Sequence, residues 1–166
     1  MTDTDTRNKL WELIQDIRFA MFTTRAADGG LHTRPLTTQN GKDHRDDALW
    51  FFVSRGSDAF AELQADGQVS VAFADPAKDR YVSVSGTGQV VDDAARKQQL
   101  WSKMNDAWFP NGPDDPDVAL LRVAIREAEY WDVKDSKLVQ LIKMARSAVT
   151  RHPPTDMGEH RSVPMH

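Results

Sequence analysis

The sequence contains no cysteine. Disulfide bonds, thiolate catalysis and metal sites built on cysteine ligands are therefore excluded. It also has no run of about 20 apolar residues, the length that a helix needs to cross a bilayer. The first residues, MTDTDTRNK, are polar and lack the apolar stretch of a signal peptide. These absences predict a cytoplasmic protein without membrane contact.

An excess of positive charge is missing as well. The chain holds 21 lysines and arginines against 25 aspartates and glutamates, a net charge of −4, with no long basic run. Proteins that neutralise many phosphates are more basic than this, so no nucleic-acid partner is expected. With 166 residues, 40% of them apolar, the chain suits one domain with one core. We expect that domain over residues 1–150 and an irregular, proline-containing tail over residues 151–166.

Motifs for several common chemistries are absent. No G-x-G-x-x-G or P-loop follows an expected strand, so a Rossmann or Walker-type fold has no support. No G-x-S-x-G turn marks a serine nucleophile, although a Ser-His-Asp triad stays open. The histidines are widely separated with no pair at helical spacing, which favours surface or loop positions over a zinc site. They are His32, His44, His152, His160 and His166.

Short strands with helices between them make up the rest of the chain. Apolar residues recur at helical spacing over residues 6–18 and again over residues 136–149. Two further helices are expected, one capped by Ser57 and ending at Gly67, the other capped by Asp92 or Asp93. The side chains expected to face inward near that last helix are Leu100, Trp101 and Met104.

Seven segments show the alternation or the bulky apolar character of strands. They are residues 19–24, 31–39, 48–54, 68–74, 80–91, 118–125 and 128–133. Six or seven strands joined by turns or single helices predict a mainly β protein. An antiparallel barrel decorated with helices is favoured over a doubly wound parallel sheet.

The segment RPLTTQ combines an arginine with short polar side chains on one expected strand. A flat heteroaromatic ligand needs polar groups along its edge and a guanidinium for an anionic group, and Arg34, Thr37, Thr38 and Gln39 offer these. An ordinary edge strand explains the same residues. Pro35 cannot donate to a ladder, so it predicts an edge, a bulge or a face turned toward something else.

The segment FFVSRGSDAF places a strand end, a turn at Gly56 and a helix start at Ser57 in succession. Free N–H groups at a helix N-terminus favour a phosphate. Simple capping by the serine is the alternative reading.

The segment AWFPNGPDDPD sets Trp108 and Phe109 among prolines, where neither helix nor strand can form. The two rings either fold back on their own domain or insert into a neighbour, since tryptophan and phenylalanine are enriched at interface centres. A pocket wall or subunit seam and a local core plug are both open.

Together, the segments TTR, HTRPLTT, LWFFVSRGS, VSVAFADP, RYVSVSGTGQVV, AWFPNGPDDPDVALLRV and AEYWD resemble the general stress protein 26 group. That group belongs to the pyridoxamine 5′-phosphate oxidase-like, FMN-binding split-barrel superfamily. The resemblance covers about residues 6–145, with GEHRSV in the tail as a further match. It implies a six-stranded antiparallel Greek-key split β-barrel with flanking helices. It also implies a homodimer with flavin at the subunit interface.

The resemblance further implies which residues bind FMN, with FAD as an alternative. One strand lies along the ring system, its arginine reaches the phosphate, a second strand contributes backbone, and a helix start holds the phosphate. A tyrosine approaches from a neighbouring strand, and a tryptophan comes from the other subunit. These cofactor-binding residues are Arg34, Pro35, Leu36, Thr37, Phe52, Val53, Ser57, Asp58, Tyr81 and Trp131, and the loop adds Trp108.

Two departures from the true oxidases bear on function. Those enzymes place two basic residues for the phosphate where this chain has Asp58 and Ala59, so Arg34 and Arg55 would have to compensate. Their Arg-x-His substrate motif after the tryptophan is replaced by DVKDSKLVQLIKM. We therefore expect a flavin-dependent oxidoreductase of unknown substrate, with electron or hydride transfer at the flavin N5. A non-enzymatic stress-related ligand-binding protein is the alternative, and true pyridoxamine 5′-phosphate oxidation is disfavoured.

Overall fold

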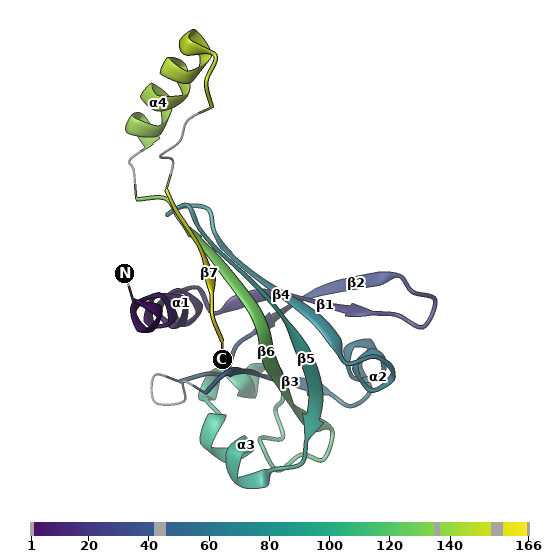
Figure 1. Ribbon diagram of the computed structural model, residues 1–166. Coiled ribbons are helices and arrows are strands. Elements are labelled where there is room, and N and C mark those ends of the chain that lie inside the picture. Colours follow the sequence, from purple (N-terminus) through teal and green to yellow (C-terminus); the bar gives the residue numbers. More distant parts are fainter. Residues whose placement is uncertain (1, 42–45, 135–136, 154–157, 166) are drawn as a thin grey trace.

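A computed structural model describes residues 2–41, 46–134, 137–153 and 158–165 (Figure 1). Within them, seven strands form one antiparallel sheet in the order β2-β1-β4-β5-β6-β3, with β7 added to β6. His44, Ser136 and His166 lie outside the described residues. The strands are β1 (Phe19–Arg25), β2 (Leu31–Thr37), β3 (Ala48–Ser54), β4 (Gln68–Asp75), β5 (Arg80–Val91), β6 (Val118–Asp132) and β7 (Glu159–Val163).

Four α-helices and one 3-10 helix are present in the described segments, and none is long and apolar enough to span a membrane. Side-chain caps explain several helix starts: Thr2 and Asp5 form a reciprocal capping box, Ser57 accepts from Phe60 N–H, and Asp93 accepts from Arg96 N–H. The helices are α1 (Asp3–Ile17), α2 (Asp58–Ala65), α3 (Ala94–Leu100), η1 (Lys103–Ala107) and α4 (Lys137–Thr150).

The curled sheet encloses the main core, and α1 packs on it through its apolar stripe. Alternate side chains of β4 are buried, and the whole of β3 before Ser54 is buried. Phe22 and Phe51 meet edge to face inside the barrel, with ring centroids 5.0 Å apart. This arrangement confirms the predicted mainly β architecture, and Pro35 lies on the edge strand β2 as expected.

The longest strand corrects one expectation. Residues 118–125 and 128–133 were expected to be separate strands, but β6 runs unbroken from Val118 to Asp132. Its ladder with β5 shifts register between Ser85 and Gly86 instead of ending. A Cβ on Gly86 would lie 2.2 Å from the Ala124 carbonyl oxygen. The missing side chain therefore lets β6 pass through an irregularity that would otherwise interrupt it.

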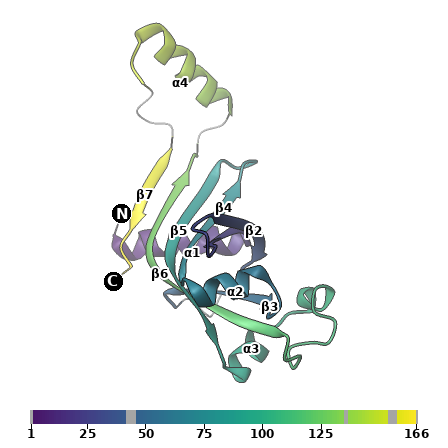
Figure 2. The same cartoon turned by 90° about the vertical axis from the view of Figure 1, so that its right-hand side faces the viewer.

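The C-terminal segment corrects a second expectation. Residues 151–166 were expected to be irregular, yet β7 pairs with the end of β6 from Val163↔Ala128 to Glu159↔Asp132. Val163 and Met165 are buried in the main core, which explains why this short, polar strand returns to the barrel. Between β6 and β7, α4 projects beyond the end of the sheet, on the side away from α3 (Figures 1 and 2).

A smaller core cluster lies under α3 and the loop that follows it. Trp50, Phe52 and Leu100 are buried there, and Trp101 and Phe109 pack against them in part. Met104 was expected to face inward with Leu100 but is 55% exposed, because it lies on η1, beyond the end of α3.

Candidate functional site

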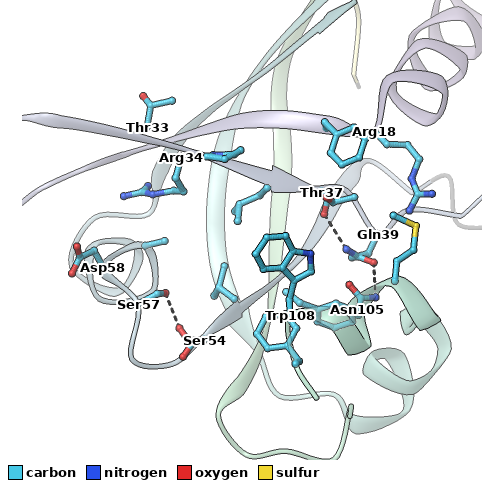
Figure 3. A pocket seen from close by; sticks show the side chains of 18 of the residues that line it. Arg18, Thr33, Arg34, Thr37, Gln39, Ser54, Ser57, Asp58, Asn105 and Trp108 are labelled. Carbon is cyan, nitrogen blue, oxygen red and sulfur yellow. Dashed lines mark hydrogen bonds between the residues drawn. The ribbon is translucent and has the colours of Figure 1, made fainter. Parts of the chain in front are cut away.

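A cavity of about 720 Å³ opens between β2, β3, the start of α2 and the η1–β6 loop (Figure 3). Its size falls within the range of small-molecule sites. Nine of the eleven residues predicted to bind the flavin line it: Arg34, Pro35, Leu36, Thr37, Phe52, Val53, Ser57, Asp58 and Trp108.

Two strands give the cavity its long walls. On β2, Pro35 and Leu36 face a space that no further strand occupies in the sheet order, so a ligand can lie along this edge. On β3, Phe52 and Val53 close the opposite side and are themselves buried. Thr38 had been grouped with Thr37 as a polar edge, but its hydroxyl turns away and donates to the Arg18 carbonyl. These walls form a mainly apolar slot.

One end of the slot carries a network of charge around Arg34. Its Nη2 donates to Glu62 Oε1 over 3.2 Å, and its Nη1 donates to the Thr24 hydroxyl. His32 Nδ1 lies 3.0 Å from the same Glu62 oxygen. The hydrogen bond with His32, supported by the charges of His32 and Arg34, holds the pKa of the Glu62 carboxyl below its ordinary value. Arg34 thus reaches the cavity with part of its charge already compensated.

The start of α2 lies at the same end of the cavity (Figure 3). Ser57 Oγ accepts from Phe60 N–H and donates to the Ser54 carbonyl, which confirms the predicted cap. The backbone N–H groups of Asp58 and Ala59 lie in the first turn of α2. They therefore have no carbonyl acceptor within the helix and are available to an anion. The Asp58 side chain is exposed, so water screens its repulsion of such an anion.

At the opposite end of the cavity, Gln39, expected from RPLTTQ, is joined by two polar residues that the sequence patterns did not single out, Asn105 and Arg18. Asn105 is buried and donates through Nδ2 to Gln39 Oε1 over 3.1 Å. Gln39 in turn donates to the Thr37 carbonyl, which fixes both amides (Figure 3). Arg18 also lines this end, from the junction of α1 and β1, where its φ is 61°. Only the barrel brings these distant segments together, so no local pattern could have shown them.

Trp108 and Phe109 take different places, so each of the two readings of AWFPNGPDDPD holds for one ring. Trp108 lines the cavity and is 81% exposed. The Phe109 ring packs into the smaller core cluster, 6.0 Å from the ring of Trp101. Trp101 in turn lies 5.0 Å from Phe52. Phe109 thereby anchors the loop and holds Trp108 at the mouth.

Tyr81 and Trp131, the other two predicted cofactor residues, do not line the cavity of their own chain. They are cross-strand neighbours where β5 begins and β6 ends, at the end of the sheet from which α4 extends (Figure 1). The His160 ring stacks on Trp131, with centroids 4.7 Å apart and planes 4° from parallel. A histidine and Arg161 therefore neighbour this tryptophan in space, although neither follows it closely in the sequence.

Arg55, proposed to compensate for the missing basic pair, does not line the cavity. Its Nε donates to the Pro116 carbonyl over 2.7 Å, and its guanidinium lies over the Phe60 ring. Across the described ranges, no group of three histidine, aspartate or glutamate side chains is arranged to hold a metal ion. Arg34 and the α2 amides are therefore the groups that face an anion at this end of the cavity.

The fold and the site together define a class of protein: an antiparallel barrel with an apolar slot along its edge strand, and a helix start with an arginine at one end of the slot. Comparison with known families identifies the family. The chain belongs to the family described as "Pyridoxamine 5'-phosphate oxidase like", whose model matches residues 5–155.

Individual relatives extend the comparison. A structure assigned to general stress protein 26 from Jannaschia sp. CCS1 is 26% identical, covers 96% of this chain and 98% of its own, and has a TM-score of 0.74. The general stress FMN/FAD binding protein from Xanthomonas citri is 30% identical over 81% of this chain and 92% of its own, with a TM-score of 0.68. Protein bli-3 of Neurospora crassa is 26% identical over 89% of this chain and 75% of its own. These neighbours confirm the split-barrel fold and the general stress protein 26 resemblance.

Proposed function

We propose that this chain binds FMN in the cavity along β2 and acts as a flavin-dependent oxidoreductase. The observation that carries the proposal is the slot itself: apolar walls from Leu36, Phe52 and Val53, with Arg34 at one end. These residues fit a flat ring system bearing a phosphate. The Xanthomonas citri relative, described as an FMN/FAD binding protein, supports the same cofactor class.

The flavin would supply the redox chemistry, and the chain would supply binding and orientation. Pro35 and Leu36 would hold the ring against β2, and the fixed Gln39–Asn105 amide pair would offer hydrogen bonds at the opposite end from Arg34. Arg34 and the first amides of α2 would receive the phosphate. The apolar walls from β2 and β3 would shield the ring from water in part, and Trp108 lies at the mouth.

The experiment is to purify the chain, record its visible absorbance and titrate it with FMN, FAD and riboflavin. We expect tight FMN binding, weaker riboflavin binding, and a loss of that difference in Arg34→Ala. Arg25→Ala is the matched control, because Arg25 is an exposed arginine on the neighbouring strand that pairs with Asp66 outside the cavity. A colourless protein that binds none of the three flavins would overturn the proposal.

A non-enzymatic ligand-binding role is the second candidate. It is favoured by Glu62, which compensates Arg34, and by Asp58 and Ala59 at the helix start where the oxidases have basic residues. Tight flavin binding without reoxidation of the reduced flavin by oxygen or quinones would favour this role. Formation of pyridoxal phosphate from the amine would instead establish the disfavoured oxidase activity.

We further propose that the chain forms a homodimer with the flavin at the subunit interface. Tyr81 and Trp131 support this, because both lie outside the cavity of their own chain and Tyr81 is exposed. Mass measurement in solution across a concentration series tests the proposal, and a chain that stays monomeric throughout would contradict it.

A further inference from the structure

The helix α4 projects away from the body of its own chain (Figures 1 and 2), and several of its apolar side chains are exposed. Leu141 is 64% exposed, Ile142 58% and Val149 85%. A hydrogen bond from Gln140 Nε2 to Asp79 Oδ2, 3.2 Å long, holds the first turn beside the β4–β5 turn. A helix that keeps an apolar stripe in water is typical of a docking element.

The pattern of α4 separates apolar from cationic residues. Leu141, Ala145 and Val149 recur four residues apart, and Ile142 widens the same stripe. Residues 137–152 contain four lysines and arginines and no aspartate or glutamate. The surface that receives this helix should therefore be apolar at its centre and acidic around it.

The mouth of the cavity has that character. Trp108 is 81% exposed, and Met104, which lines the same cavity, is 55% exposed. Residues 103–117, which carry both side chains, contain four aspartates and one lysine. The helix α4 and the cavity mouth are thus complementary. The apolar stripe of α4 matches the exposed Trp108 and Met104, and its lysines and arginines match the aspartates of residues 103–117.

The helix cannot reach the mouth of its own cavity. Ser54 lines the cavity and pairs with Val118 at the start of β6, whereas α4 follows Asp132 at its end. The intervening 15-residue strand follows a path of roughly 50 Å. The four residues between β6 and α4 span about 14 Å at most, and the helix itself adds about 21 Å, so together they are shorter than that path. The complementary surface must therefore belong to another molecule.

We propose that α4 docks over the cavity mouth of a second copy of this chain, with its apolar stripe on Trp108 and Met104 and its cations facing residues 103–117. The exchange is reciprocal, since one two-fold axis lets each helix cover the other copy's cavity. The role of α4 as a wall of a flavin site rests on the proposed function, whereas the docking itself does not.

The experiment compares two variants of the full chain in solution. Leu141→Glu/Ile142→Glu places charge in the stripe, and Ser147→Glu/Thr150→Glu places the same charge on the polar face. Both sites lie on a helix outside the core clusters, so folding is retained. We expect the stripe variant to raise the dimer dissociation constant at least about tenfold and the control to change it much less.

Four outcomes decide the proposal. A stripe variant that dimerises as tightly as the control overturns it, as does a parent chain that stays monomeric. Co-sedimentation of monomeric parent chain with phosphatidylserine vesicles also overturns it and assigns α4 to an anionic membrane. Stripe-dependent dimerisation of a chain that binds no FMN, FAD or riboflavin supports the docking while the proposed function fails.

Discussion

Arg34 Nη2 donates to Glu62 Oε1 over 3.2 Å at one end of the cavity, so the cation that we propose faces a phosphate is already paired. Glu62 is 11% exposed at its side chain, and Arg34 is 22% exposed. A partly shielded pair of this kind lowers the net field at the cavity without removing the guanidinium donors. In the proposed function, the contribution of Arg34 on β2 to phosphate binding therefore depends on Glu62 on α2.

We predict that Glu62→Gln tightens FMN binding severalfold. The amide still accepts a hydrogen bond from Arg34 but no longer cancels its charge, so more of that charge acts on the phosphate. Titration of the bound flavin's fluorescence measures the effect. Riboflavin, which lacks the phosphate, is the internal control and should bind both forms equally.

The opposite result would show that Glu62 acts by orienting Arg34. Weaker FMN binding in Glu62→Gln, together with no further loss in Glu62→Gln/Arg34→Ala, would establish that the two residues act as a unit. His32→Gln tests the other contact of the carboxylate and should change FMN affinity less, because His32 lies farther out on β2 and is exposed.

We predict that Trp108→Ala and Phe109→Ala separate ligand binding from stability. Trp108 lies on the surface of the folded chain, so its removal should change the free energy of unfolding of the monomer by no more than about 0.5 kcal/mol. Phe109 packs against Trp101, and its removal should cost about 1–3 kcal/mol. Urea unfolding measures the stability of both variants, where Phe109→Ala should have the larger effect. FMN titration measures ligand binding, where the effect of Trp108→Ala should appear without a matching loss of stability. A large loss of monomer stability in Trp108→Ala would contradict this division.

Local rules in the sequence were sufficient for features whose cause is local. The Ser57 cap, the edge position of Pro35 and the amphipathic helix before β1 all depend on neighbouring residues. The return of residues 159–163 as β7 depends instead on burial of Val163 and Met165 against residues far away in the sequence. The hydrophobic alternation of a polar five-residue strand is too weak to predict that it pairs with β6.

The candidate site divides in the same way. Eight of the nine cavity residues followed from the family resemblance, because RPLTT and FFVSRGSD are contiguous segments, and the ninth, Trp108, followed from the proline-rich loop. The family resemblance gave no role to Glu62, which lies one turn inside α2 and accepts a hydrogen bond from Arg34. Arg18 and Asn105 line the same cavity only because α1 and η1 flank the same end of the barrel. No spacing along the sequence indicates that proximity.

We predict that Gly86→Ala is among the most destabilising single changes in the chain. Its added methyl would lie 2.2 Å from the Ala124 carbonyl oxygen, so the two central strands must separate at the register shift. A cost of about 1–3 kcal/mol follows from such overpacking. Gly56→Ala is the control, because its methyl meets only Ser54 Oγ at 3.8 Å. Equal urea midpoints for the two variants would contradict the close approach.

The ring of Tyr130 is fully buried where β6 pairs with β7. Its hydroxyl donates to Glu159 Oε1 over 3.2 Å. Burial, reinforced by the negative charge of Glu159, raises the pKa of Tyr130 to about 12. In Tyr81→Phe, where Tyr130 is the only remaining tyrosine, the ultraviolet absorbance of tyrosinate should therefore appear only as the pH approaches that value.

The same shift makes stability depend on pH in one direction. The unfolded chain ionises Tyr130 near its ordinary pKa of 10.0, whereas the folded chain keeps the proton until about 12. The contribution of protonated Tyr130 to the free energy of unfolding is therefore complete below pH 10. It is lost as the pH rises through the folded-state pKa. Tyr130→Phe removes the ionisable group, so its unfolding free energy should fall less between pH 10 and 12 than that of the parent chain. Parallel pH profiles for the two proteins would mean that Tyr130 is ionised in the folded state as readily as in the unfolded chain, and that its burial beside Glu159 has no such effect.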